Sequence, residues 1–253
     1  MNNRPLTLIT GASRGMGQAM AHQLLAAGHE LLCIARHADE ELAARARAAG
    51  LPCEQWTVDL ANPGPVAERL RQWLVQRAGA LPASLNLINN AGVIPSIAPI
   101  GQVPASELAS ALRVGLEAPM LLTGAFLEAT ANWTCPRKVL NISSGLGRRA
   151  MASQAAYCAA KAGMDHFSRC VALEEALRPH GAKVCSLAPG VIATDMQAQL
   201  RSAPAELFPD RGNFRALKDQ GMLLSPEDAG ARVLAWLARP DFGANPVADV
   251  RDA

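Results

Sequence analysis

Three polar side chains in the middle of the chain have the types and spacing needed to move a proton to or from a carbonyl oxygen. Tyr157 is the only tyrosine of the sequence, Lys161 follows it by four residues, and Ser144 precedes it. In a helix, residues four apart project from one face. A phenol is a weak base near neutral pH, and a neighbouring ammonium group lowers its pKa by stabilising the phenolate. We therefore expect Tyr157 to act as general acid or base, Lys161 to tune it, and Ser144 to polarise the substrate oxygen. The alternative for Tyr157 and Lys161 is a surface pair on an amphipathic helix.

A glycine-rich turn near the N-terminus is typical of sites that bind nucleotide phosphates. The strand-like run Leu6–Thr10 leads into GASRGMG at 11–17 and then into a helical segment. The glycines let the backbone turn tightly and approach a pyrophosphate, and the N–H groups at a helix start attract anions. An ordinary glycine-rich turn is the alternative. The residues expected to bind the cofactor here are Gly11, Ser13, Arg14, Gly15, Met16 and Gly17.

Two arginines favour NADP(H) over NAD(H) as the cofactor. Arg14 lies within the turn, and Arg36 directly follows the second strand-like run. Proteins that bind NAD usually carry an acidic residue at this second place, where it binds the ribose hydroxyls. An arginine would instead pair with the 2′-phosphate of NADP, and His37 could add a donor. The alternative for Arg36 is an ordinary solvated residue.

Further candidate residues follow later strand-like runs. Asp59 and Leu60 come after the third run, NNAG occupies 89–92 after the fourth, and Ser144 follows the fifth. The carboxyl ends of parallel strands meet at one edge of a sheet, and ligands bind there. The sequence therefore predicts that these residues share one site.

The alternation of short apolar runs with longer helical segments predicts an α/β fold. We expect a doubly wound parallel sheet of about seven strands, with helices on both faces. The expected strands are Leu6–Thr10, Glu30–Ala35, Cys53–Val58, Leu85–Asn89, Lys138–Ser143, Lys183–Ala188 and Pro246–Val250. The expected helices are Gly15–Ala27, Ala38–Ala48, Pro63–Arg77, Pro104–Ala131, Gln154–Arg178 and Ser225–Ala238.

The chain reads as one domain, residues 1–253, without repeats or linkers. Pro119 predicts a kink in the fourth helix. The stretch 190–221 is rich in proline and glycine, so we expect an irregular segment that covers the substrate. Residues 94–97 and 146–151 are the other expected walls of the substrate pocket.

Composition excludes several other classes of protein. The net charge is +2, and 18% of the residues are charged, which gives no reason to expect nucleic acid or a membrane as partner. The six cysteines have no CxxC or zinc-finger spacing, so we expect no metal site and a reducing, cytoplasmic environment. No secretory signal or membrane span is expected either.

The chain resembles the classical short-chain dehydrogenase/reductase family. The matching segments are TGASRGMG at 10–17, VDL at 58–60, NNAG at 89–92, Ser144, YCAAK at 157–161 and APGVIATDM at 188–196. The resemblance implies a Rossmann-type domain, an NAD(P)-dependent oxidoreductase, and a homodimer or homotetramer assembled through 104–131 and 154–178. It also implies a set of cofactor contacts: Asp59 and Leu60 at the adenine, Asn89, Ala91 and Gly92 along the cofactor, and Pro189, Gly190, Ile192 and Thr194 at the nicotinamide.

Two departures from the family pattern bear on activity. Gly115 stands where the family usually has an asparagine that helps to hold a water in a proton relay through Lys161, and a glycine would leave a gap there. The C-terminal segment resembles the sepiapterin and benzil reductase branch, in which an aspartate matching Asp249 holds the substrate. We expect an NADPH-dependent reductase of a ketone or dicarbonyl compound. The alternatives are an NADP(H)-binding sensor with impaired catalysis and an NAD-dependent alcohol dehydrogenase.

Overall fold

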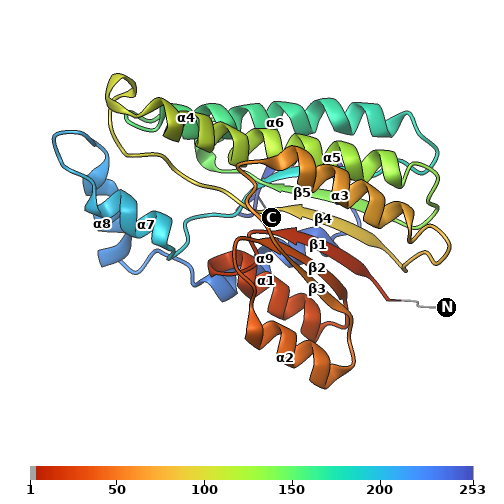
Figure 1. Cartoon of the computed structure of the whole chain (residues 1–253). Coiled ribbons are helices and arrows are strands. Elements are labelled where there is room, and N and C mark those ends of the chain that lie inside the picture. The colour runs from red at the N-terminus through yellow and green to blue at the C-terminus, as the bar shows by residue number, and fades with distance from the viewer. Residues whose placement is uncertain (1–3, 253) are drawn as a thin grey trace.

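The computed structural model describes residues 4–252 and contains one parallel sheet of seven strands. The strand order is β3-β2-β1-β4-β5-β6-β7 (Figure 1). The prediction of a seven-stranded parallel sheet is confirmed. The strands are β1 Leu6–Thr10, β2 Glu30–Ala35, β3 Cys53–Thr57, β4 Leu85–Asn89, β5 Arg137–Ile142, β6 Lys183–Ala188 and β7 Val247–Asp249.

Helices cover both faces of the sheet because the strands are apolar on both sides. Helices α1, α2 and α9 lie on one face, and α3, α4, α5 and α6 on the other (Figure 1). Each face has its own buried core. The long helices are α1 Gly15–Ala26, α2 Glu40–Ala49, α3 Pro63–Val75, α4 Ala105–Leu112, α5 Ala118–Ala129, α6 Ala155–Ala176 and α9 Pro226–Ala238.

The strand order places a topological switch point between β1 and β4. The chain runs from β1 outward through β2 and β3, then crosses to β4 on the other side of β1. Open α/β sheets bind ligands beyond the carboxyl ends of the strands at such a point. The glycine turn after β1 and the NNAG segment after β4 flank it.

The helix expected over 104–131 is interrupted by a π-helical turn at Arg113–Glu117. Pro119 has no N–H to donate to the Gly115 carbonyl, and its ring would collide with that carbonyl in a regular α-helix. The wider turn lets the Ala118 N–H bond to the Arg113 carbonyl instead. The predicted kink at Pro119 thus takes the form of a π turn directly before it.

The expectation that 190–221 is irregular is wrong, because the segment contains helices α7, Asp195–Ser202, and α8, Arg211–Asp219. The prolines that suggested irregularity lie between the two helices. Both helices lie to one side of the layered body, beyond the carboxyl ends of the strands (Figure 1). They have a separate apolar cluster, in which buried Phe208 stacks on Phe214 with the ring centroids 5.5 Å apart.

That cluster joins the three segments expected to wall the substrate pocket. Ile94 and Ile97 enter it from the segment after β4, Met151 from the segment after β5, and Phe208 from the 190–221 stretch. The sequence thus identified three separate segments that pack together.

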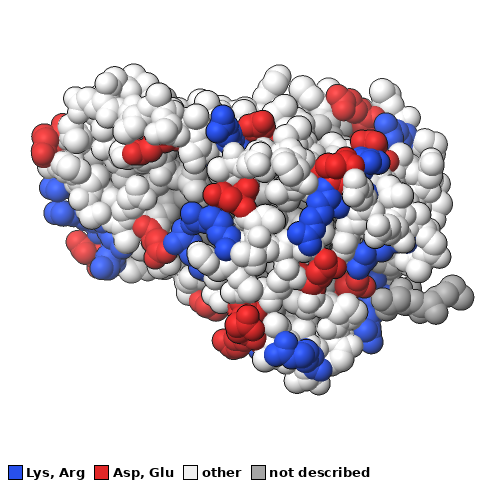
Figure 2. Space-filling view, in the orientation of Figure 1, with Lys and Arg blue, Asp and Glu red and all other residues white. Residues whose placement is uncertain are grey.

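The surface carries charges of both signs. Figure 2 shows acidic and basic side chains interspersed over one face, without a broad patch of either sign among the residues described there. Within 4–252, no helix has both the length and the hydrophobicity to cross a membrane. The predicted single domain 1–253 includes residues 1–3 and 253, which lie outside the described residues.

Candidate active site

The glycine turn has the close backbone packing that a phosphate cradle requires. Gly11 and Gly15 have φ of +69° and +55°, in the left-handed region that favours glycine. A Cβ atom on Gly17 would lie 2.1 Å from the Gly11 carbonyl oxygen. The turn therefore leaves backbone N–H groups exposed at the start of α1, where an anion can bind. The Met16 side chain is buried in the core, so only its backbone can face a ligand.

Arg14 is paired across the site with a residue of the covering segment. Its guanidinium Nη1 lies 2.7 Å from Oδ2 of Asp195, in the first turn of α7, and both side chains are exposed. Thr194 also approaches the turn, since its Cγ2 would lie 3.7 Å from a Cβ on Gly15. The start of α7 thus lies against the turn.

An exposed arginine follows β2, whereas the carboxylate three residues later is buried. Arg36 is exposed directly after the strand. The nearest carboxylate in the sequence, Asp39, is buried and accepts hydrogen bonds from the Leu42 N–H, Gln18 and His22. Burial alone would raise the pKa of Asp39, but these hydrogen bonds outweigh it and lower the pKa. Asp39 is therefore committed to capping α2, not to a ribose.

Of the predicted site residues after β3 and at the end of β4, one has an exposed side chain and two have buried side chains. Asp59 is exposed, whereas the Leu60 side chain is buried in the core. Asn89 is buried, and its amide Nδ2 donates to Asn141 Oδ1 at 2.8 Å and to Thr123 Oγ1 at 3.2 Å. The Asn89 amide nitrogen therefore joins β4 to β5 and α5, whereas its Oδ1 is buried without a hydrogen-bond partner among the described residues.

Asn90 is a positioning residue that the sequence did not single out. Its Nδ2 donates to the carbonyl oxygens of Thr10 and Gly11, at 3.0 and 3.2 Å. It thereby ties the strand end of β4 to the glycine turn. Its place within NNAG was the available signal. Gly92 follows, and a Cβ there would lie 4.0 Å from Nζ of Lys161.

Helix α6 brings Tyr157 and Lys161 to the carboxyl end of β5. Lys161 is 4% exposed, and its Nζ donates to the Ile142 carbonyl oxygen at 2.7 Å. The same Nζ lies 5.8 Å from the centroid of the Tyr157 ring. Ser144 lies two residues beyond the end of β5, and its hydroxyl interacts with the Tyr157 phenol closely enough to oppose the rise of the phenol pKa. The three residues predicted to share a site are therefore together.

The ionisation of these groups differs from the expectation. Burial raises the pKa of Tyr157 to about 12, although the hydrogen bond with Ser144 opposes the shift. Burial also lowers the pKa of Lys161 to about 8, against the opposing charge of Asp165. The expected net lowering of the phenol pKa is not found in this structure, because burial is the largest influence on that pKa and Lys161 is not among the groups that shift it. The Tyr157 phenol is protonated at neutral pH.

The segment after β6 returns beside the same edge. Pro189 is buried, Gly190 has φ of +86°, and Ile192 pairs with Leu224 in an isolated parallel bridge. Together with Thr194, these residues run from the end of β6 to the glycine turn.

Asp249 is not free for a substrate in this arrangement. Its carboxylate binds the Arg251 guanidinium through two hydrogen bonds of 2.7 and 2.6 Å. The side chain is only 7% exposed. The Arg251 interaction lowers the pKa of Asp249, so the carboxylate stays ionised.

Gly115 packs closely against α6. It is buried in the π turn, and a Cβ on it would lie 3.2 Å from Cβ of Ala160, the residue before Lys161. The glycine therefore allows the π turn to pack closely against α6.

A family model agrees with this geometry: residues 5–205 match the model for short chain dehydrogenases. The chain belongs to this family. It is an oxidoreductase that acts on carbonyl or CH–OH groups. Its relatives include the benzil reductase ((S)-benzoin forming) of Bacillus cereus, which is 34% identical over 93% of this chain and 94% of that protein. The sepiapterin reductase of Meriones unguiculatus is 30% identical over 97% and 95%.

Solved structures show the same fold. The crystal structure of an Agrobacterium tumefaciens protein described as a 2-deoxy-D-gluconate 3-dehydrogenase, with bound NADP, has a TM-score of 0.78 to this chain. The two chains are 27% identical, and the match covers 99% of this chain and 95% of that one. The predicted resemblance to the benzil and sepiapterin reductase branch is confirmed by these relatives.

Proposed function

We propose that this short-chain dehydrogenase is an NADPH-dependent reductase of apolar ketones or dicarbonyl compounds, with Tyr157 as the general acid. The observation that carries the proposal is the meeting of Ser144, Tyr157 and Lys161 beyond the end of β5, with Lys161 Nζ 4.0 Å from a Cβ placed on Gly92. In this proposal the phenol donates a proton to a carbonyl oxygen held beside the nicotinamide.

The cofactor proposal rests on the two ends of the predicted site. The cradle formed by Gly11, Gly15 and Gly17 suits a pyrophosphate. Arg36 is exposed where a 2′-phosphate would lie, and Asp39 is turned inward. A similar structure holds NADP. The remaining proposed contacts are Ser13, Arg14, Met16, Asp59, Leu60, Asn89, Ala91, Gly92, Tyr157, Lys161, Pro189, Gly190, Ile192 and Thr194.

The nicotinamide supplies a hydride when it is bound, and the chain supplies the proton. Tyr157, with its pKa of about 12, remains protonated at neutral pH and is ready to donate. The developing alkoxide of the substrate is a far stronger base than a phenolate, so transfer from Tyr157 is downhill. Ser144 donates a hydrogen bond to the same oxygen as its charge develops. The Lys161 ammonium binds the ribose and compensates the phenolate charge left on Tyr157.

The proposed substrate class follows from the covering segment. Phe208, Phe214, Met151 and Ile94 contribute to an apolar cluster with two stacked aromatic rings. Its partly exposed members, Ile94, Met151 and Phe214, favour a substrate with apolar or aromatic groups on the carbonyl carbons. The benzil reductase relatives are named for benzil, a diketone with a phenyl group on each carbonyl carbon. A pterin is less well supported because Asp249 is already bound to Arg251.

The test is steady-state reduction by the purified protein. We expect oxidation of NADPH in the presence of benzil, with kcat/KM for NADPH exceeding that for NADH. A higher kcat/KM for NADH would contradict the cofactor assignment and favour an NAD-dependent dehydrogenase. Tight NADPH binding without turnover of a panel of ketones and dicarbonyl compounds would contradict catalysis and favour a sensor.

Self-association is proposed through α4, α5 and α6. Exposed apolar side chains gather on these helices: Leu112, Met120, Leu121, Leu173 and Leu177. Burying them against a second copy would remove apolar surface from water. A mass of two or four chains by light scattering is expected, and a monomer at micromolar concentration would contradict it. The six unpaired thiols suit the proposed cytoplasmic location.

A further inference from the structure

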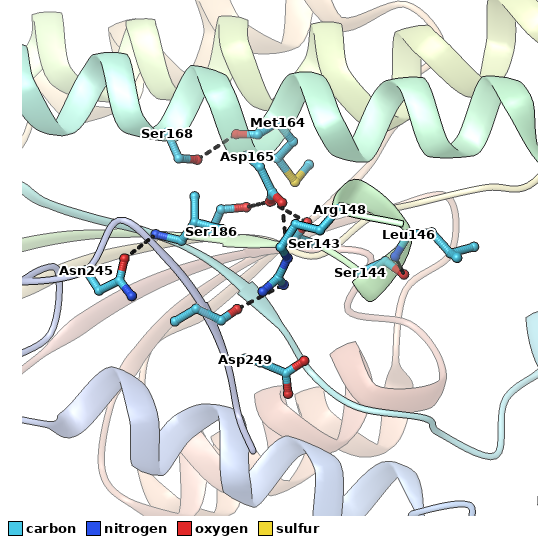
Figure 3. Close-up of polar contacts among 12 residues, drawn as sticks. Ser143, Ser144, Leu146, Arg148, Met164, Asp165, Ser168, Ser186, Asn245 and Asp249 are labelled. Atoms are coloured by element: carbon cyan, nitrogen blue, oxygen red, sulfur yellow. Dashed lines mark hydrogen bonds and ion pairs between the residues drawn. The ribbon is translucent and has the colours of Figure 1, made fainter. Parts of the chain in front are cut away.

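The face of α6 that carries Tyr157 and Lys161 continues with two more polar residues. Asp165 follows Lys161 by four residues, and Ser168 follows Asp165 by three, which is the spacing of a single helical stripe. Asp165 is 1% exposed and Ser168 is fully buried. Figure 3 shows both directed from α6 toward the neighbouring strand.

This stripe is hydrogen-bonded to consecutive residues at the end of β5. Reading along the strand, Asn141 Nδ2 donates to Ser168 Oγ at 2.9 Å, the Ile142 carbonyl accepts from Lys161 Nζ at 2.7 Å, and Ser143 Oγ donates to Asp165 Oδ1 at 2.5 Å. The next residue is Ser144, whose hydroxyl accepts from the Leu146 N–H at 3.2 Å and opposes the rise of the Tyr157 pKa. We call this series the α6–β5 seam. It fixes the position of α6 against the strand end that supplies Ser144.

Asp165 is the most heavily used group of the seam. Its Oδ1 accepts from Ser143 and also from Ser186 of β6, the latter at 2.7 Å. Its Oδ2 has no hydrogen bond among the described residues but lies 3.6 Å from Nε of Arg148. Gly147 passes directly over this oxygen, since a Cβ there would lie 2.7 Å from it.

Arg148 extends the seam to the last strand of the sheet. Its guanidinium faces Asp165 through Nε, and its Nη2 donates to the Ala248 carbonyl oxygen of β7 at 3.2 Å (Figure 3). The loop from Ser144 to Arg148 is therefore held at both ends. The Arg148 guanidinium is therefore used in contacts within the protein.

A buried carboxylate is a costly way to hold two strands together. Removing its charge from water is unfavourable, and apolar residues of similar size often stabilise a core equally well. Unlike apolar contacts, the hydrogen bonds of a carboxylate are directional, because each donor must point at an oxygen atom. Here the hydrogen bond to Asp165 fixes the orientation of Ser143, and Ser144 is the next residue in the chain.

We propose that Asp165 is a positioning residue for carbonyl reduction, which holds Ser143 and Arg148 so that the Ser144 hydroxyl stays at the Tyr157 phenol. The proposal rests on the role proposed above for Ser144 and Tyr157. Asp165 itself contacts neither substrate nor cofactor. It acts through the strand end at Ser143 and through the loop that Arg148 closes.

A matched pair of serine variants separates positioning from simple stability. Ser143→Ala and Ser186→Ala each remove one buried hydroxyl that binds the same oxygen of Asp165, so both should lower the melting temperature similarly. Only Ser143 adjoins Ser144. We expect Ser143→Ala to lower kcat for benzil by about 10- to 100-fold with little change in KM for NADPH, since small misplacements of catalytic groups have effects of that size. Ser186→Ala should retain nearly the wild-type kcat.

Variants of Asp165 give the conservative comparison. Asp165→Ala should lower kcat at least as much as Ser143→Ala, and Asp165→Asn should restore part of the loss because its amide oxygen still accepts from Ser143. Equal loss of kcat in both serine variants, or no loss in either, would overturn the proposal. If Asp165→Ala fails to fold, the serine pair still decides the question.

The single tyrosine of the chain provides a readout that needs no turnover. Protein labelled with 3-fluorotyrosine has one ¹⁹F resonance, which reports the surroundings of Tyr157. The Ser144→Ala variant gives the chemical shift of this resonance when the serine hydroxyl is absent. We expect Ser143→Ala to move the resonance toward that position and Ser186→Ala to leave it in place. Absence of any benzil reduction by the wild type would defeat the proposed function alone. An unmoved resonance in Ser143→Ala would overturn the positioning role of Asp165, whatever the activity.

Discussion

The guanidinium of Arg14 lies 2.7 Å from the carboxylate of Asp195, although 181 residues separate them in the chain. One partner belongs to the glycine turn and the other to the first turn of α7. If Arg14 binds the 2′-phosphate of NADP, the phosphate competes with Asp195 for the same guanidinium.

Asp195→Asn should therefore tighten NADPH binding. Exposed ion pairs contribute at most about 1 kcal/mol, so the expected gain in affinity is up to about fivefold. NADH lacks the phosphate and should bind as before. Fluorescence titration of both nucleotides measures the effect. Weaker NADPH binding in the variant would show that the pair assists the cofactor instead of competing with it.

Arg36→Glu should reduce the preference for NADPH. A hydrogen bond to a charged group contributes about 1.5–3 kcal/mol, so kcat/KM for NADPH should fall by roughly 10- to 100-fold while that for NADH changes little. Arg47→Glu makes the same charge change at an exposed position on α2 and should have little effect. A similar loss in both variants would attribute the effect to net charge rather than to a phosphate contact.

Gly17→Ala should abolish nucleotide binding and lower the melting temperature. The added methyl group would lie 2.1 Å from the Gly11 carbonyl oxygen, so the turn must open. Gly64→Ala is the matched control, because a Cβ there meets nothing within 4 Å and alanine favours the helix by about 1 kcal/mol. Retention of NADPH binding in Gly17→Ala would contradict the assignment of the turn as the pyrophosphate site.

The pH dependence of activity should reflect Lys161. Burial lowers its pKa to about 8, so the amine loses its proton as the pH rises through that value. Reduction needs the ammonium to compensate the phenolate, so kcat/KM for NADPH should fall above about pH 8. Asp165 opposes the lowering, and its replacement by asparagine should move the fall to lower pH. A shift to higher pH in Asp165→Asn would contradict this electrostatic account.

The sequence predicted those parts of the molecule that local patterns determine. Continuous apolar runs such as Leu31–Ala35 correspond to buried parallel strands, and the spacing of Tyr157 and Lys161 requires only one helix. The glycine turn was likewise predictable, because Gly11 and Gly15 need a left-handed backbone.

Features that depend on long-range packing were not predicted. Asp195, the partner of Arg14, lies on α7, in a segment that the sequence pattern did not identify as helical. The burial of Asp39 depends on hydrogen bonds from Gln18 and His22 of α1. The raised pKa of Tyr157 follows from burial, which no local pattern reports. The role of Asp165 required the relative placement of α6, β5 and β6.

The central claim is that Tyr157 supplies the proton in carbonyl reduction. Tyr157→Phe removes one hydroxyl group and keeps the ring, so the variant should bind NADPH with nearly the wild-type Kd. General acid catalysis typically contributes about 10²- to 10⁴-fold, and kcat for benzil should fall by that factor. The deciding measurement is kcat of Tyr157→Phe with NADPH binding determined on the same preparation. A kcat close to that of the wild type would contradict the account.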